Sequence, residues 1–442
     1  MKTILVLGAG RSSSSLIHYL LENAPVYDWH VIVGDLSEQG ALEKIGASRY
    51  GSAMRFDIRD EVASKSLIGN ADVVVSLMPA NLHPAVAKLC IVTKKHFLNA
   101  SYVSDEMKTF DAVAKESDLL FLNECGLDPG LDHMSAMQII DRIKNGGGIL
   151  TSFESFTGGL IAPQTDPENP WRYKFTWNPR NVVTAGQGTA KFLDEGQFKY
   201  IPYQQLFKRT TPVTVLDIQY EGYPNRDSLK YLTTYGLYGI KTMIRGTLRN
   251  AGYCSAWNLL VQLGCCDDTY LMENVSEMTH RDFIDAFLEY KAGKSLEEKI
   301  CAWYKIDLNS GEMERLRWSG FFSDEIIGLN QGTPAQVLEH ILNKKWQLKS
   351  GDKDFIVMWH QFTYKRNGET KRLRSHVTVE GEDEIKTAMA KTVGLPLGMA
   401  AKLLLQGKIK SRGVVIPVIK EIYDPILEEL NTLGIRVVED EA

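Results

Sequence analysis

The chain has 442 residues, of which 44% are hydrophobic and 24% are charged, and its formal net charge is −5. This length exceeds the size at which one hydrophobic core keeps growing, so we expect more than one domain. The composition is typical of a globular protein and not of a disordered or fibrous one. The negative charge excludes the basic footprint of a nucleic-acid-binding protein and favours a small-molecule partner.

The cysteine and hydropathy patterns predict a soluble cytoplasmic protein that binds neither metal nor membrane. The six cysteines are scattered, without a Cys-x-x-Cys pair or His/Cys ligand spacing, which argues against zinc and against a disulfide framework. The apolar run at residues 4–7 is too short for a signal peptide. No stretch approaches the ~20 apolar residues that a membrane-spanning helix needs.

Over the first 124 residues, short runs rich in β-branched residues alternate with segments of helical length. The runs at residues 3–7, 30–33, 72–77, 96–99 and 119–123 are expected to be strands. Such alternation is typical of βαβ units in a parallel sheet. We therefore predict an α/β fold that begins with a Rossmann dinucleotide-binding domain, formed by residues 1–129 with 395–442.

The first strand leads into a Gly-x-Gly-x-x-Ser version of the dinucleotide fingerprint. The first glycine permits a tight turn, and the second lets a pyrophosphate approach the backbone N–H groups of the next helix. Asp35 ends the second strand, where a carboxylate binds the adenosine ribose and repels a 2′-phosphate, so NAD is favoured over NADP. The cofactor residues expected at the strand ends are Gly8, Ala9, Gly10, Arg11, Ser12, Asp35, Asp57, Ile58, Leu77, Ala100 and Ser101. The alternatives are a plain strand-to-helix turn and, for Asp35, a helix cap.

The remainder of the chain predicts a mixed α+β domain with an all-helical insertion. Apolar spacing indicates a helix from residue 131 to 143, and strands are expected at 150–157 and 213–220. Strands at 355–364 and 371–379 flank Asn367-Gly368, which suits the type I′ turn of a hairpin. We expect residues 130–255 with 350–394 to form a substrate domain and 256–349 the helical insertion. The tail should hold a helix at 385–406, a strand at 414–419 and a helix at 425–433.

Four sequence blocks resemble the glutamate-forming saccharopine dehydrogenase family. They lie at residues 123–134 (NECGLDPGLDHM), 158–163 with 173–177, 223–228 (YPNRDS) and 244–249 (IRGTLR). The likeness runs over nearly the whole chain and implies a Rossmann domain, a substrate and dimer domain, and a helical domain inserted in the second. It also implies a homodimer that joins aminoadipate semialdehyde to glutamate with a nicotinamide dinucleotide, giving saccharopine, or the reverse, in lysine metabolism.

The resemblance also implies site residues. The substrate would be lined by Ser101, Tyr102, Asp128, Arg226, Thr247, Leu248 and Arg249. The nicotinamide would lie beside Leu127, Asp128, Pro129 and Trp177. Saccharopine carries three carboxylates, which guanidinium groups bind bidentately, so Arg226 and Arg249 are the favoured ligands. Arg245 and Lys174 are weaker candidates.

Asp128 is the predicted catalytic residue. It could be a general acid or base in imine formation, or stabilise the iminium that accepts hydride. It could instead cap the following helix, with Pro129 in the first helical position. Fungal family members have a cysteine where Thr157 stands and an arginine where Asp35 stands. The first departure removes a thiol acid or base, and the second weakens the NADP assignment and leaves NAD preference or dual use.

Two other functions fit parts of the sequence. A carboxynorspermidine dehydrogenase resembles the chain in its first domain but tends to differ in the 223–228 and 244–249 blocks. A non-catalytic nucleotide-sensing protein would keep the fold, although Asp128, Arg226 and Arg249 together speak against it. His133 and Cys125 are expected to be structural residues.

Overall fold

The computed structural model describes residues 1–185 and 187–441, which form two compact units. The first unit comprises Met1–Ile149, Arg366–Glu369 and Val377–Glu439, and the second begins at Leu150 and includes Leu150–Lys365. By contacts, the helix after residue 130 belongs to the first unit, and the helices of 256–349 belong to the second. The finer three-domain division stays a prediction from the sequence.

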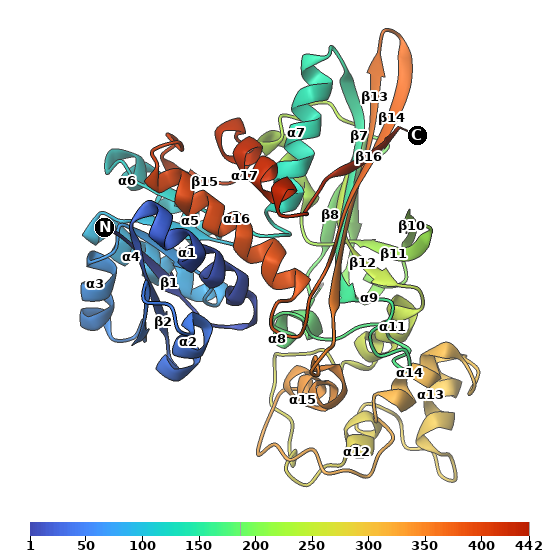
Figure 1. Ribbon diagram of the computed structural model, residues 1–442. Coiled ribbons are helices and arrows are strands. Elements are labelled where there is room, and N and C mark those ends of the chain that lie inside the picture. The colour runs from blue at the N-terminus through green and yellow to red at the C-terminus, as the bar shows by residue number, and fades with distance from the viewer. Residues whose placement is uncertain (186, 442) are drawn as a thin grey trace. The chain divides into compact units, whose positions relative to one another are not determined.

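The first unit is built on a seven-stranded sheet of order β15-β6-β5-β4-β1-β2-β3. Every neighbouring pair in it is parallel, and Figure 1 shows helices on both of its faces. This is the predicted Rossmann architecture, in which ligands gather at the carboxyl ends of the strands. The strands are β1 (Lys2–Leu7), β2 (Trp29–Asp35), β3 (Gly51–Arg55), β4 (Val73–Ser76), β5 (His96–Asn99), β6 (Leu120–Leu122) and β15 (Gly413–Val415).

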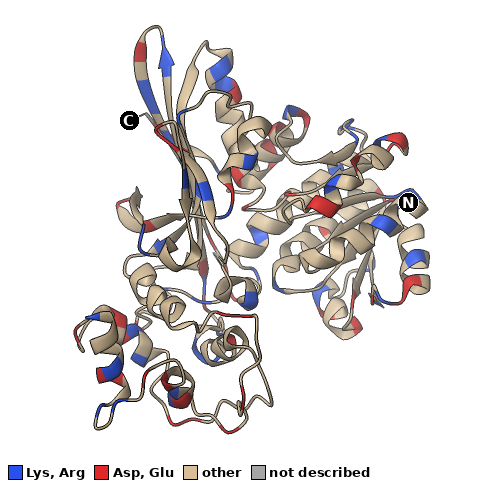
Figure 2. Ribbon diagram, turned by 180° about the vertical axis from the view of Figure 1, so that it is seen from behind, with Lys and Arg blue, Asp and Glu red and all other residues tan. Residues whose placement is uncertain are grey.

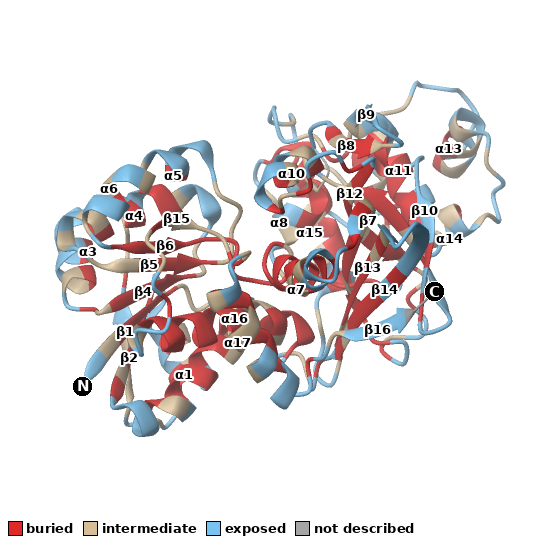
Figure 3. Ribbon diagram, turned by 90° about the horizontal axis from the view of Figure 1, so that it is seen from above, coloured by how far each residue is buried: buried red, intermediate tan, exposed pale blue. Residues whose placement is uncertain are grey.

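Helices from both ends of the chain cover this sheet, and α16 packs against α1 while α17 packs against α7. The predicted return of the tail is therefore confirmed. The helices are α1 (Ser14–Tyr27), α2 (Glu38–Ile45), α3 (Glu61–Gly69), α4 (His83–Thr93), α5 (Asp105–Thr109), α6 (Asp111–Glu116), α7 (Leu131–Asn145), α16 (Ala388–Leu405) and α17 (Lys420–Thr432). In the described chain, only α16 is long and apolar enough to cross a bilayer, and 78% of that stretch is buried inside the protein (Figure 3).

Two tail predictions need correction. The strand expected at 414–419 ends at Val415, because Pro417 cannot donate a hydrogen bond to a ladder. The last helix begins at Lys420, five residues before the expected start at Pro425, which lies inside the helix. Because proline is common at helix starts, the sequence predicts the start of this helix at Pro425, which is too late.

The second unit is built on a mixed sheet of order β10-β11-β12-β7-β13-β14-β16, to which β8 and β9 attach at β12. The hairpin at Asn367-Gly368 is confirmed, since both residues have the positive φ that a type I′ turn requires (53° and 83°). The strand expected at 213–220 is instead a hairpin that turns at Leu216-Asp217, a pair without the usual glycine or asparagine signal. The strands are β7 (Ile149–Ile161), β8 (Ala190–Asp194), β9 (Gln197–Ile201), β10 (Thr211–Val215), β11 (Ile218–Pro224), β12 (Thr242–Asn250), β13 (Asp354–Arg366), β14 (Glu369–Glu380) and β16 (Val438–Glu441).

The described residues of 256–349 form helices and no strand, as predicted. Their core is continuous with that of the sheet, through an aromatic cluster in which Tyr173 and Trp346 pack with ring centroids 5.0 Å apart. The helices of the second unit are α8 (Pro179–Val183), α9 (Tyr203–Leu206), α10 (Tyr231–Thr234), α11 (Tyr253–Leu263), α12 (His280–Asp285), α13 (Leu296–Tyr304), α14 (Gly311–Trp318) and α15 (Pro334–Trp346).

Candidate active site

The loop between β1 and α1 has the geometry of a dinucleotide-binding turn. Gly8 has φ 100°, and a Cβ there would lie 3.1 Å from the carbonyl carbon of Leu77. A Cβ on Gly10 would meet no atom within 4 Å, so the loop leaves open space at its second glycine. Arg11 and Ser12 follow in a 3-10 turn that leads into α1. The loop therefore fits a pyrophosphate placed against the backbone at the start of a helix.

Asp35 lies beside this glycine loop. Its Oδ2 accepts a hydrogen bond from the Ala9 N–H at 2.7 Å, and its Oδ1 accepts one from the Ser37 N–H at 2.9 Å. The helix-cap alternative for Asp35 is wrong, because the Ser37 side chain caps α2 by accepting from the Gly40 N–H. The carboxylate thus occupies the end of β2 where an adenosine ribose is bound in such folds.

The other predicted cofactor residues also follow parallel strands of this sheet. Asp57 and Ile58 come after β3, Leu77 after β4, and Ala100 and Ser101 after β5. Asp57 is engaged by the exposed Arg59 guanidinium, whose hydrogen bonds lower the pKa of that carboxyl to about 2. The Asp57 carboxylate already has a local partner, so its cofactor role stays a prediction.

Asp128 pairs with Tyr102, whose hydroxyl donates a hydrogen bond to the Asp128 Oδ1 at 2.7 Å. Helix α7 begins at Leu131 and has Gly130 as its N-cap, without a side-chain cap. The alternative that Asp128 caps this helix, with Pro129 in its first position, is therefore wrong. Asp128 keeps a tyrosine partner in the first unit, beside a cis peptide bond to Pro129.

The loop that carries Asp128 closes on itself. The Leu131 N–H donates to the Gly126 oxygen at 2.7 Å, and the Gly126 N–H donates to the Pro129 oxygen at 2.9 Å. Gly130 has φ 147°, and a Cβ there would lie 2.1 Å from the Gly126 oxygen. Only glycine fits this approach, so the Gly-Leu-Asp-Pro-Gly sequence dictates the position of Asp128.

Sequence reasoning missed a buried pair behind this loop. The Nε2 of His133 lies 2.8 Å from the Oε2 of Glu124, and both side chains are at most 5% exposed. The Oε1 of Glu124 accepts from the Val103 N–H at 2.9 Å. A glutamate nine residues before a histidine gives no recognisable spacing signal, and only the fold brings the two together.

In the second unit, Arg249 is a buried cation on β12. It is 4% exposed, and its guanidinium lies 5.0 Å from the Tyr173 ring centroid and 5.2 Å from that of Tyr253. The Nη1 donates to the Leu248 oxygen at 3.0 Å, whereas the Nε has no partner. No carboxylate of the described chain forms an ion pair with Arg249. A buried charge without a counter-ion is costly, so an anion bound beside Arg249 would be favourable.

Two threonines lie on the same face of the sheet as Arg249. Thr247 is two residues before it on β12, and its Oγ1 accepts from the Asn225 Nδ2 at 2.9 Å. Thr157 is the register partner of Thr247 on parallel β7, and its buried Oγ1 has no hydrogen-bond partner. Leu248 is fully buried in the hydrophobic core, so only its backbone is available to a ligand.

Tyrosines close to Arg249 supply neutral hydroxyl donors. Burial raises the pKa of Tyr223 to about 12, although the Arg249 charge opposes this shift. Burial likewise raises the pKa values of Tyr173 and Tyr253. These hydroxyls stay protonated at neutral pH, so an anion beside Arg249 would meet hydrogen-bond donors and no competing charge.

The remaining candidates differ in their surroundings. Arg226 is exposed at the turn after β11, and its oxygen accepts from the Lys191 N–H. The antiparallel pairing of β11 with β12 places Arg226 about five residues from Arg249, or roughly 16 Å along the strand. Lys174 is a structural ion pair, with its Nζ 2.8 Å from Asp166 and 2.6 Å from Asp352.

Arg245 and Trp177 are the last two candidates in the second unit. Arg245 is buried, with its guanidinium 4.2 Å from the Tyr231 ring centroid. Trp177 is partly buried against the core of the unit.

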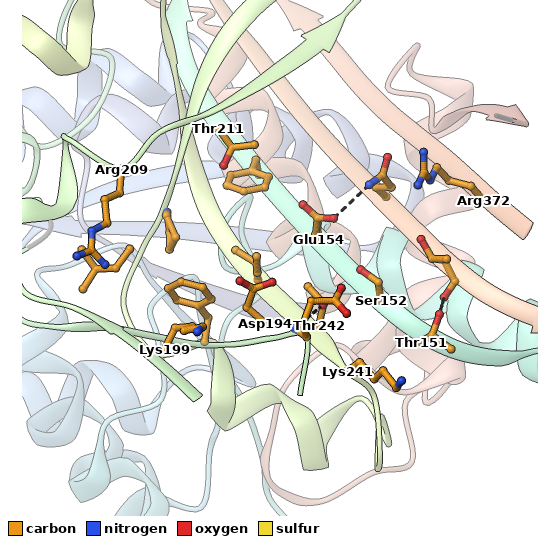
Figure 4. A pocket seen from close by; sticks show the side chains of 18 of the residues that line it. Thr151, Ser152, Glu154, Asp194, Lys199, Arg209, Thr211, Lys241, Thr242 and Arg372 are labelled. Atoms are coloured by element: carbon orange, nitrogen blue, oxygen red, sulfur yellow. Dashed lines mark hydrogen bonds between the residues drawn. The ribbon is translucent and has the colours of Figure 1, made fainter. Parts of the chain in front are cut away.

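A cavity of about 850 Å³ lies on the opposite face of this sheet (Figure 4). Its lining includes Ser152, Glu154 and Phe156 of β7 and Ile244 of β12, which alternate with the residues that face Arg249. None of the predicted site residues lines it. The cavity is therefore separate from the predicted substrate face.

The parallel sheet with its glycine loop has the architecture of a dinucleotide-binding protein. Two family models match the chain: the saccharopine dehydrogenase NADP binding domain over residues 4–122, and the saccharopine dehydrogenase C-terminal domain over residues 126–435. The chain belongs to the saccharopine dehydrogenase family, and the resemblance inferred from the sequence is confirmed.

Individual relatives agree with this assignment. The chain is 31% identical to the saccharopine dehydrogenase [NADP(+), L-glutamate-forming] of Saccharomyces cerevisiae, with 97% of this chain and 96% of that protein covered. The structure of the apo L-Glu-forming enzyme from that yeast matches with a TM-score of 0.89 over 100% of both chains. The chain is also 34% identical to the mitochondrial alpha-aminoadipic semialdehyde synthase of Bos taurus over 98% of its own length, but spans only 47% of that protein.

Proposed function

We propose that this protein is a glutamate-forming saccharopine dehydrogenase, which oxidises saccharopine to aminoadipate semialdehyde and glutamate or catalyses the reverse reaction. The observation that carries the proposal is the buried Arg249, which has no carboxylate partner in the described chain. Saccharopine is an amine with three carboxylates, and a guanidinium binds a carboxylate in bidentate geometry. Arg226, at the other end of the same strand pair, would bind a second carboxylate of the substrate.

The two units supply different parts of the chemistry. The glycine loop of the first unit would hold a nicotinamide dinucleotide, whose chemistry is hydride exchange with the aminoadipate-side carbon bonded to the secondary amine. In the oxidative direction the amine nitrogen loses its proton, the resulting imine takes up water, and the carbon–nitrogen bond breaks to release glutamate. We assign the proton transfers of imine hydrolysis to Asp128, whose carboxylate the Tyr102 hydroxyl holds in place. Thr247, Arg249 and the orphaned Thr157 hydroxyl would bind the substrate in the second unit.

The preferred cofactor in this proposal is NAD. Fungal relatives carry NADP(+) in their names, and the matching domain is described as NADP binding. In this chain Asp35 holds a carboxylate at the end of β2, 2.7 Å from the Ala9 N–H. A carboxylate in that place favours the ribose hydroxyls of NAD and repels the 2′-phosphate of NADP.

One assay tests both substrate and cofactor. Saccharopine and carboxynorspermidine are each offered with NAD and NADP at equal concentrations, and the absorbance of the reduced nicotinamide is followed. We expect turnover with saccharopine and NAD, and a lower NAD/NADP ratio in Asp35→Ser. Turnover with carboxynorspermidine alone, or none with either amine, would reject the proposed substrate. A strong NADP preference in the unaltered enzyme would reject only the cofactor assignment.

We further propose a homodimer that forms through the cavity-bearing face of the second sheet. Glu154 and Asp194 lie on this face beside Arg209 and Arg372, so two copies related by a twofold axis can pair acid with base. The β13–β14 hairpin that borders it is rich in Lys and Arg (Figure 2).

Light scattering in solution should give twice the mass of one chain, and Glu154→Arg should shift the protein towards monomer. The matched control, Glu22→Arg in the first unit, should remain a dimer. A monomeric unaltered protein would contradict this proposal.

A further inference from the structure

The buried Glu124–His133 pair connects the two segments that carry Tyr102 and Asp128. Glu124 follows β6, and His133 lies in the first turn of α7. Their side chains meet at 2.8 Å with 5% and 0% exposure, respectively. Neither side chain is accessible to a substrate, so the pair cannot act as an acid or base on one.

Glu124 fixes the segment that carries Tyr102. Its Oε1 accepts from the Val103 N–H at 2.9 Å, and its own N–H donates to the Ser101 oxygen at 3.1 Å. Glu124 therefore binds the backbone on both sides of Tyr102. This double attachment constrains the position of the Tyr102 hydroxyl.

His133 links that segment to the loop that carries Asp128. Its Nδ1 lies 3.7 Å from the Oδ1 of Asp132, and that oxygen accepts from the Gly130 N–H at 2.7 Å. Gly130 in turn closes on Gly126, which defines the loop around Asp128. Contacts thus run from Val103 through Glu124 and His133 to the loop that holds the aspartate.

We propose that Glu124 and His133 are positioning residues that hold the Tyr102 hydroxyl against the Asp128 carboxylate for proton transfer. This inference rests on the proposed function, since it deepens the acid–base role of Asp128. Small displacements of catalytic groups by remote changes can cost about 10²-fold in rate. A pair buried from solvent preserves the 2.7 Å contact without touching substrate or dinucleotide.

A double-mutant cycle tests the inference. We expect Tyr102→Phe to lower kcat about tenfold in the unaltered enzyme, but less than about threefold when Glu124 is already alanine. Glu124→Ala and His133→Asn should each lower kcat about 10- to 100-fold, and the Kd of the dinucleotide should change less than about twofold. Glu124→Gln, which can still accept from the Val103 N–H, should recover much of the rate. Fully additive effects of the two substitutions would overturn the positioning role.

A matched control comes from the same helix. The Tyr423 hydroxyl donates to Asp141 near the far end of α7, so Tyr423→Phe also removes a hydrogen bond from that helix. It should leave kcat within about twofold. If Tyr423→Phe lowers kcat as much as His133→Asn, the effect is general loosening of the helix and the proposal fails.

Hydrogen exchange supplies a readout that is independent of activity. The Val103 amide should lose protection in Glu124→Ala and keep it in Glu124→Gln. If the unaltered enzyme is inactive on saccharopine but the variants show this exchange pattern, the proposed function is rejected. The contact between Glu124 and the Val103 amide is then still supported. Unchanged protection in Glu124→Ala would reject the attachment itself.

Discussion

Replacing Arg249 by methionine should lower kcat/KM for saccharopine by about 10²- to 10³-fold without destabilising the protein. Loss of one member of a buried charge pair costs about 2–5 kcal/mol of binding, and each 1.4 kcal/mol is about tenfold. In the ligand-free protein, however, Arg249 is a buried cation without a carboxylate partner. An apolar side chain of similar volume removes the desolvation cost of that charge, so the free energy of unfolding should not fall.

The matched control for this prediction is Lys174→Met. Lys174 is as buried as Arg249, but it pairs with Asp166 and Asp352, so its loss leaves two carboxylates without their cation. We expect that variant to lose about 3–5 kcal/mol of stability. Thermal unfolding with and without saccharopine separates the two cases, because Arg249→Met should keep its Tm but lose the stabilisation by substrate. An Arg249→Met protein that unfolds like Lys174→Met would make Arg249 a structural residue.

The first unit was predictable because its signals are local. A strand that is followed by Gly8 and Gly10, and further strands in regular alternation with helices, lead to one parallel topology. The same holds for the Asn367-Gly368 hairpin, because these two residues alone favour the type I′ turn. Where a turn lacks such chemistry, as at Leu216-Asp217, sequence reasoning merges two strands into one.

Long-range contacts set the limits of prediction at the site. The family blocks identified Arg249 and Asp128. They did not predict the tyrosine rings around Arg249 or the hydrogen bond from the Tyr102 hydroxyl to Asp128. Lys174 and Arg249 look alike in the sequence, since both are cations in blocks that resemble the family. Their partners in the structure differ, because Lys174 pairs with two carboxylates and Arg249 lies against aromatic rings. These partners distinguish a structural cation from a ligand-binding one.

Asp128→Asn should lower kcat about 10²- to 10⁴-fold while the dinucleotide Kd changes less than about threefold. The amide oxygen can still accept from the Tyr102 hydroxyl, so the loop geometry is kept and only the charge and proton capacity are lost. General acid–base catalysis contributes about 10²- to 10⁴-fold, which sets the size of the effect. A variant with more than a tenth of the original kcat would remove Asp128 from the chemistry.

Single-turnover kinetics of the same variant distinguish the two roles open to Asp128. If the carboxylate moves protons during imine hydrolysis, the first burst of reduced nicotinamide survives in Asp128→Asn and only later turnovers slow down. If it stabilises the developing iminium charge, hydride transfer itself loses a favourable electrostatic interaction and the burst slows as well. Because the Tyr102 hydroxyl holds this carboxylate in place, Tyr102→Phe should slow the same phase as Asp128→Asn, but by only about tenfold.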